Sequence, residues 1–205
     1  MIFNQKQAGL TLIEMMIAMV LGLFVTAVII TVFSTNVRSS TENIKMIRLN
    51  QELRGVMTMM VDELKRHGYS SDSTNVNFMD DFSISSTCAR YSYDETNRDP
   101  AGSETDGVRD ADERFGFELN GSTIMWARDF TSTDCSSSTT PTSITDPNLA
   151  SIVTLDFTTS IVNIGGTNVH MVEIELVGET TLPHSVGPVK RTIIETVRIR
   201  NYDPG

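Results

Sequence analysis

The sequence has 205 residues and a formal net charge of -10, and 40% of its residues are hydrophobic. That length suits one domain with an appendage, or two very small domains, and it allows a core to be buried. The acidity is concentrated between Asp80 and Glu118, where eleven acidic residues accompany only Arg90, Arg98, Arg109 and Arg114. Because an acidic surface repels phosphate, we expect no nucleic acid to bind the isolated globular part of the chain.

A long uncharged apolar segment lies near the amino terminus. From Met15 to Phe33, nineteen consecutive residues carry no charge, and at about 1.5 Å per helical residue they span most of a hydrocarbon core of roughly 30 Å. A removable secretory signal has a shorter apolar region followed by an A-x-A site, and no such site follows Phe33. We therefore expect the segment to remain as a transmembrane helix. Basic residues flank it on both sides, so their distribution does not set its orientation.

The residues just before the apolar segment carry a specific motif. A short hydrophilic stretch, residues 1–8, leads to Gly9 and then to Leu10-Thr11-Leu12-Ile13-Glu14. This arrangement resembles the class III signal of type IV prepilins and type II secretion pseudopilins, in which a leader ending in glycine precedes a T-L-x-E segment and an apolar helix. The resemblance implies cleavage after Gly9 by a prepilin peptidase at the cytoplasmic face and methylation of the new amino terminus on Leu10. Leu10 stands where the family usually has phenylalanine.

Glu14 is a carboxylate at the edge of the apolar segment. A charged residue at the centre of a membrane helix costs about 2.5 to 3.5 kcal/mol on insertion scales, so such a residue usually has a partner. The family resemblance implies that Glu14 neutralises the terminal amine of a neighbouring subunit as that subunit joins a filament. The alternative is an interfacial glutamate whose carboxylate reaches the headgroup region.

The helix is predicted to continue beyond the membrane. No proline occurs before Pro100, and apolar residues recur at steps of three and four, which indicates an amphipathic helix with one buried stripe. The stripe consists of Met46, Leu49, Leu53, Val56, Met57, Met60, Val61 and Leu64. Basic residues followed by Gly68 are typical of a helix end. We interpret His67 as a helix-end cation and predict a helix over residues 10–67, with its transmembrane part at 10–33.

Two further stretches carry a second resemblance. Asp62-Glu63-Leu64-Lys65-Arg66-His67-Gly68-Tyr69 and Val197-Arg198-Ile199-Arg200-Asn201 are similar to the D-x-(L/I)-(K/R)-x-x-G-Y helix end and the V-x-(L/I)-R-N carboxyl end of the group formed by the minor pilin PilW and pseudopilin J. The chain also lacks the cysteine pair near the carboxyl terminus that is often seen in major pilins.

Residues 68–205 are predicted to form a β-rich globular domain. Alternating apolar residues around two turn signals predict two hairpins. The first pairs 115–119 with 123–128 across Asn120-Gly121, and the second pairs 153–161 with 169–177 across Gly165-Gly166. A last strand at 192–200 completes an antiparallel sheet. In the first hairpin Ile124 and Trp126 are expected on one face. In the second, apolar residues alternate as Val153, Leu155, Phe157 and Ile161, and Val172, Ile174 and Leu176 oppose an outward Glu173 and Glu175.

Cys88 and Cys135 are the two cysteines of the chain, so one intrachain pairing is available. In an oxidising compartment we expect a disulfide that ties the loop after the helix to the loop after the first hairpin, and chain entropy gives it about 4 kcal/mol for a loop of this length. The alternative is two unpaired cysteines that act as small hydrophobic residues.

Other chemistry has little support in the sequence. Carboxylates cluster in residues 106–113, and their oxygen ligands suit calcium, but their spacing fits no EF-hand loop and we assign no metal. His67, His170 and His184 have no zinc-ligand spacing and no neighbouring nucleophile motif. We therefore predict no catalytic residue, no cofactor and no enzymatic activity.

Together these observations predict an α+β, type IV pilin-like fold: a leader at 1–9, a long helix at 10–67 and a periplasmic antiparallel β domain at 68–205. The resemblance implies a minor type IV pilin that helps to initiate or cap a pilus, anchored in the inner membrane before assembly. Its partners would be prepilin peptidase and the other minor and major pilins. Two alternatives remain open, a minor pseudopilin J of type II secretion and a non-polymerising single-span protein that anchors a periplasmic binding domain.

Overall fold

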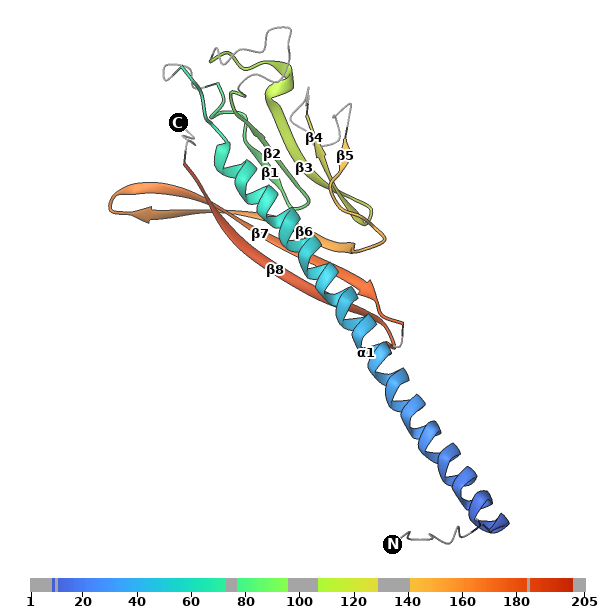
Figure 1. Cartoon of the computed structure of the whole chain (residues 1–205). Helices are drawn as coiled ribbons and strands as arrows, with labels where there is room; N and C mark the ends of the chain where they lie inside the picture. Colours follow the sequence, from blue (N-terminus) through green and yellow to red (C-terminus); the bar gives the residue numbers. More distant parts are fainter. Residues whose placement is uncertain are drawn as a thin grey trace, which may run out of the picture. The chain divides into compact units, whose positions relative to one another are not determined.

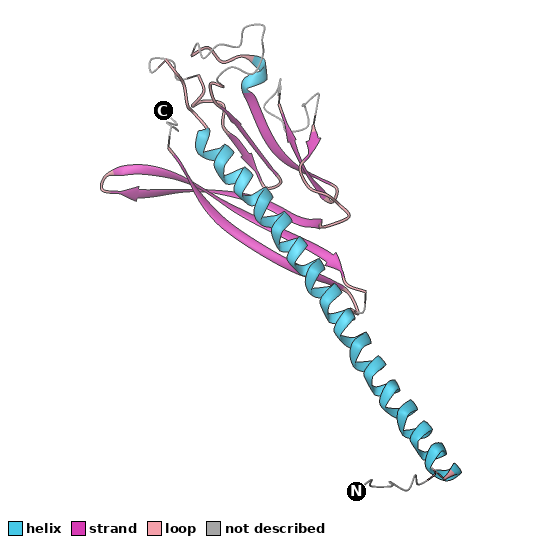
Figure 2. Ribbon diagram, in the orientation of Figure 1, coloured by secondary structure: helices cyan, strands magenta, loops and turns pink. Residues whose placement is uncertain are grey.

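The computed structural model describes residues 9, 11–72, 77–95, 107–128, 141–183 and 185–200. Its elements, in chain order (Figures 1 and 2), are α1 (Leu12–Arg66), β1 (Ser83–Ser85), β2 (Cys88–Ser92), the short 3₁₀ helix η1 (Ala111–Glu113), β3 (Arg114–Asn120), β4 (Thr123–Ala127), β5 (Thr142–Ser143), β6 (Ser151–Ile164), β7 (Thr167–Thr181) and β8 (Pro188–Ile199). One long helix followed by antiparallel strands confirms the predicted α+β fold. The chain forms two compact units, residues 1–44 and 45–205, and we call the second the head unit.

The first unit is the amino-terminal part of α1. None of its described residues from Thr11 to Ile44 is buried. Four threonine hydroxyls in this part donate to the carbonyl four residues earlier: Thr26 to Gly22 at 2.8 Å, Thr31 to Ala27 at 2.9 Å, Thr35 to Thr31 at 3.0 Å and Thr41 to Val37 at 2.9 Å. The helix therefore satisfies these hydroxyls by itself, as an apolar environment requires.

The rest of α1 belongs to the head unit and buries one stripe. Its buried residues are Leu49, Leu53, Val56, Met57, Met60 and Leu64, so the predicted stripe is confirmed, with Met46 and Val61 partly buried at its margin. The helix ends at Arg66, close to the predicted end. Gly68 has φ of 73°, the left-handed conformation that favours glycine after a helix.

One antiparallel sheet of the head unit has the strand order β1-β2-β3-β4-β5. The predicted hairpin is present as β3 and β4, but Asn120 pairs with Thr123 and is the last paired residue, so the turn consists of Gly121 and Ser122. Gly121 supplies the positive φ, 61°, that this two-residue turn needs. Strands β1, β2 and β5 were not expected from the sequence.

The other sheet has the order β6-β7-β8, and β6 and β7 form a long hairpin across Gly165 and Gly166, as predicted. The register shifts between Ile152 and Thr154, which marks a bulge. The bulge turns Ile152 inward and leaves Val153 exposed, so Val153 does not share a face with the buried Leu155 and Phe157 as the predicted alternation implied. Ile161 is also exposed, because it lies near the hairpin turn.

A single hydrophobic core in the head unit combines the α1 stripe with residues of both sheets. The central contributors from the first sheet are Tyr91, Tyr93, Phe115, Phe117 and Ile124, and those from the second are Ile152, Leu155, Phe157, Val172, Ile174, Leu176 and Val197. α1 and β7 lie close together at Gly178, where an added Cβ atom would be 2.6 Å from Leu53 Cδ2. Glycine is thus required there by packing rather than by backbone conformation.

Candidate assembly segment and head contacts

Of the two residues at the predicted cleavage site, Gly9 is exposed, whereas Leu10, the predicted site of methylation, lies outside the described residues. The carbonyl of Thr11 accepts hydrogen bonds from Glu14 N at 3.1 Å and Met15 N at 3.2 Å, so the helix starts directly after the predicted cleavage site. Glu14 lies in the first turn, where a negative charge favours the helix dipole. Its side chain is exposed and forms no ion pair with another described residue.

The residues that follow Glu14 present apolar side chains on every side of the helix. Large hydrophobic residues from Leu12 to Phe33 are all exposed, Phe24 to 69%. The helix is long and apolar enough to cross a membrane, and none of its most apolar window is buried. Such a surface is stable only in lipid or against other apolar helices, so the segment fits a single-pass membrane anchor.

The other end of α1 is fixed to the first sheet by one carboxylate. Glu63 Oε2 accepts hydrogen bonds from the hydroxyls of Tyr91 at 3.2 Å and Tyr93 at 2.9 Å, and Glu63 Oε1 pairs with Arg66 at 3.1 Å. The indole of Trp126 donates to the Tyr91 oxygen at 3.2 Å. Burial, with the Glu63 charge second, raises the pKa of both tyrosines, so both phenols remain hydrogen-bond donors at neutral pH.

His67 does not act as the helix-end cation that the sequence suggested. Its ring is fully buried, stacks on Phe82 with centroids 4.5 Å apart and places Nδ1 3.2 Å from the carbonyl of Ser92. Burial lowers the pKa of His67 from 6.5 to about 4, so the ring is neutral at pH 7. A charged imidazole would lose its hydration there.

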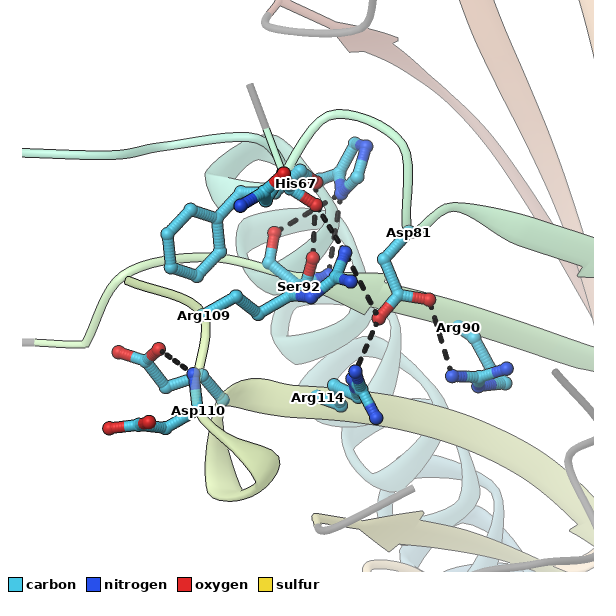
Figure 3. Close-up of polar contacts among 10 residues, drawn as sticks. His67, Asp81, Arg90, Ser92, Arg109, Asp110 and Arg114 are labelled. Carbon is cyan, nitrogen blue, oxygen red and sulfur yellow. Dashed lines mark hydrogen bonds and ion pairs between the residues drawn. The ribbon is translucent and has the colours of Figure 1, made fainter. Parts of the chain in front are cut away.

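Asp81 joins three arginines that come from separate parts of the chain (Figure 3). Its Oδ1 lies 3.3 Å from Arg90, and its Oδ2 lies 3.2 Å from Arg114 and 3.8 Å from Arg109. The Arg90 side chain is only 3% exposed. A buried guanidinium is tolerated because this carboxylate neutralises it, so Asp81 holds the segment before β1 against β2 and β3.

Two carboxylates in or near the acidic cluster at 106–113, to which we assigned no metal, accept hydrogen bonds within the head unit. Glu113 accepts hydrogen bonds from the backbone of Glu95 and Asp110, both at 2.9 Å. Asp94 Oδ2 accepts from Ser71 and from Gly107 N. Burial raises the pKa of Glu113. These carboxylates fix the segments that precede and follow residues 96–106, while Asp106 lies outside the described residues.

Cys88 is buried, at 3% exposure, as the first residue of β2 rather than in a loop. No cysteine among the described residues is free. Cys135 and His184 lie outside the described part of the chain. His170 lies in β7, as predicted.

An apolar amino-terminal helix with one early glutamate, joined to a head of antiparallel sheets, defines a type IV pilin-like protein. The comparisons agree, since residues 4–30 match the prokaryotic N-terminal methylation motif and residues 42–199 match prepilin peptidase-dependent protein B. The chain therefore belongs to the family of prepilin peptidase-dependent protein B. No curated protein and no solved structure matches it. Pilin-like families consist of structural subunits rather than enzymes.

Proposed function

We propose that this chain is a minor type IV pilin that prepilin peptidase cleaves after Gly9 and that helps to initiate or cap a pilus. Its partners are the other minor and major pilins, and its head is periplasmic before assembly. The methylation-motif match and the exposed apolar helix support this function. Packed helices of this kind make a heterologous interface that does not close, which produces a helical filament.

The observation that carries the proposal is the position of Glu14. It is an exposed carboxylate in an otherwise apolar helix surface, and no described residue of its own chain pairs with it. The amino terminus of a neighbouring pilin subunit supplies the missing positive charge. Without Glu14, that amine would be buried in the filament at a cost of several kcal/mol, which changes incorporation more than about tenfold.

The test compares wild type with Glu14→Leu and Glu14→Asp. Leucine suits lipid, so Glu14→Leu inserts and is cleaved normally but is lost from sheared filaments. Glu14→Asp keeps the charge and is the matched control, which retains part of the incorporation. Immunoblots of membranes and sheared filaments measure both steps. Normal incorporation of Glu14→Leu would show that the carboxylate recruits no neighbour.

Processing is tested by mass spectrometry of the membrane protein. We expect a mature chain that starts at Leu10 and carries an added methyl group on its amino nitrogen. A chain that keeps Met1 in cells with active prepilin peptidase would contradict the proposal. Deletion of the gene should reduce piliation, whereas loss of protein secretion with intact pili would assign the chain to a type II secretion pseudopilus.

We also propose that Cys88 and Cys135 form a disulfide in the exported protein. The burial of Cys88 and the absence of a free cysteine among the described residues support the pairing. Peptide mapping of protein alkylated before reduction tests it. Recovery of both residues as alkylated thiols would exclude the bond.

A further inference from the structure

The far end of the β6–β7 hairpin is exposed and uncharged. Strand β8 ends at Ile199, opposite His170, so beyond that pair no strand among the described residues flanks β7, and the hairpin projects from the sheet (Figure 1). Residues 157–169 contain no charged residue. Ile161 and Ile164 are each 60% exposed. Exposure of these apolar side chains to water is unfavourable, which suggests that another molecule covers this surface.

The backbone of β6 has an open edge along the same stretch. Phe157 N donates to the carbonyl of Ser86 at 3.0 Å, so its polar groups are directed away from β7. Because alternate residues of a strand direct their backbone groups to the same edge, Thr159, Ile161 and Asn163 also direct theirs away from β7. In the described part of the chain, no backbone hydrogen bond reaches this edge beyond Phe157.

A cavity of about 430 Å³ lies beside this edge. Phe82 and Ile84, in and next to the edge strand β1, form one wall, and β6 and β7 form the other through Thr159, Ile161, His170 and Val172. An open strand edge beside a cavity suits strand addition, in which an extended segment of a partner joins the edge of a sheet. The edge supplies main-chain hydrogen bonds, and the cavity receives alternate side chains of the added strand.

Natural proteins protect an exposed edge strand with charged residues, proline or a bulge. Residues 158–164 have no charge and no proline, and the only bulge of β6 lies earlier, between Ile152 and Thr154. An unprotected edge of β-branched residues promotes aggregation unless a partner covers it in the working state. The edge is also continuous with the existing contact between Phe157 and Ser86, which a new strand would extend.

We propose that an extended, uncharged strand of a different filament subunit pairs with the open edge of β6 at Thr159, Ile161 and Asn163 and places apolar side chains in the cavity. This inference rests on the proposed function, since the partner is a subunit of the same filament. The hairpin has no basic residue for lipid headgroups, and the acidic Asp156 and Glu173 at its base disfavour an anionic membrane. In the proposed pilus the neighbours of this chain are the other minor and major pilins, so the added strand is assigned to a different subunit rather than to a second copy.

Hydrogen exchange of the full chain tests the pairing at single residues. The chain in detergent is compared with the chain in sheared filaments. In detergent, the amides of Thr159, Ile161 and Asn163 exchange rapidly, while those of Ser160 and Val162, which are directed toward β7, exchange slowly. In filaments the three edge amides slow by about tenfold or more, because a hydrogen bond forms only there. Protection of neighbouring amides without this alternation would indicate cover by side chains and would overturn strand pairing.

Two variants at one position complete the test. Ile161→Pro removes an outward N–H that no described residue uses, and proline is tolerated on an edge strand. Ile161→Val keeps the N–H and is the control. We expect Ile161→Pro to be depleted from filaments about tenfold while Ile161→Val assembles normally.

The outcomes separate the two proposals. If wild type is present in filaments but its edge amides stay exposed, or if Ile161→Pro assembles like wild type, strand pairing is wrong and the pilin function stands. If wild type is absent from filaments, both are wrong. Edge protection that rises with protein concentration in detergent would identify a second copy of this chain and overturn the assignment to a different subunit.

Discussion

The two halves of α1 have the same backbone conformation and are stabilised in different ways. In residues 12–44 no side chain is buried, and apolar side chains surround the helix. In residues 45–66 six apolar side chains on one stripe are buried, and Leu53 has no exposed surface. The stability of the first half depends on the lipid or protein that surrounds it, whereas the stability of the second half depends on packing against residues of the same chain. Substitutions should therefore affect the stability of the head unit only when they fall within it.

The largest effect is expected for Asp81→Ala. This change leaves the buried Arg90 and two further arginines without their shared carboxylate, which costs about 3 to 5 kcal/mol of unfolding free energy. Urea unfolding in detergent, followed by fluorescence of the single residue Trp126, measures the head unit alone. The control, Asp80→Ala, removes an exposed carboxylate and should change stability by less than about 0.5 kcal/mol. Equal effects would contradict a specific role for Asp81.

The second-largest effect is a loss of unfolding free energy at low pH. An unfolded histidine binds a proton near pH 6.5, and the folded His67 binds one only near pH 4. The stability that its neutral form contributes is therefore full above pH 6.5 and falls as pH decreases toward 4, by about 3 kcal/mol, although the nearby Asp81 charge opposes the shift. The unfolding free energies of wild type and His67→Phe should converge or cross in this pH range. A difference that does not depend on pH would show that His67 is not the group responsible.

A smaller effect is expected where α1 touches β7. Gly178→Ala places a methyl group 2.6 Å from Leu53 Cδ2 in a full core, at a cost of about 1 to 3 kcal/mol. Gly187→Ala is the control, because nothing lies within 4 Å of its added Cβ. In a Leu53→Ala background the cost of Gly178→Ala should disappear. A cost that persists in this background would show that the added methyl group clashes with a core residue other than Leu53.

The smallest effect on the head unit is expected in the first half of the helix. Phe24→Leu alters an exposed apolar residue and should leave the urea midpoint of Trp126 fluorescence unchanged within about 0.5 kcal/mol. Its consequence should appear only in the recovery of the chain from filaments, where neighbouring helices touch this surface. A large shift of the midpoint would break the proposed independence of the two halves.

Local patterns in the sequence were enough to predict the long helix, its buried stripe, its glycine end and both hairpins. Strand β2 was missed because its residues are buried on both faces, so they show no alternation. An arginine in a short segment also suggests solvent exposure. Arg90 is buried because Asp81, which comes from a different segment, neutralises it, and no local pattern shows that pairing.

The errors in the candidate sites have a related cause. His67 follows two basic residues, so its sequence context indicates a surface cation, while its burial depends on Phe82 and Ser92 from later segments. Val153 fits the alternation of its strand, and one bulge reverses its direction. Gly9, Leu10 and Glu14 were identified from a contiguous motif, but their roles depend on a peptidase and a neighbouring subunit and so stay predictions.

The threonine hydroxyls of the first helical half determine how easily this helix changes solvent. Thr26, Thr31 and Thr35 each donate a hydrogen bond to a carbonyl of their own helix, so their hydroxyls need no acceptor from lipid or from another subunit. If the helix passes from lipid into a filament, as proposed above, these hydrogen bonds do not have to break or be replaced. Apart from apolar packing, the free energy of that transfer then depends most strongly on Glu14, because it is the only charged side chain among residues 12–37.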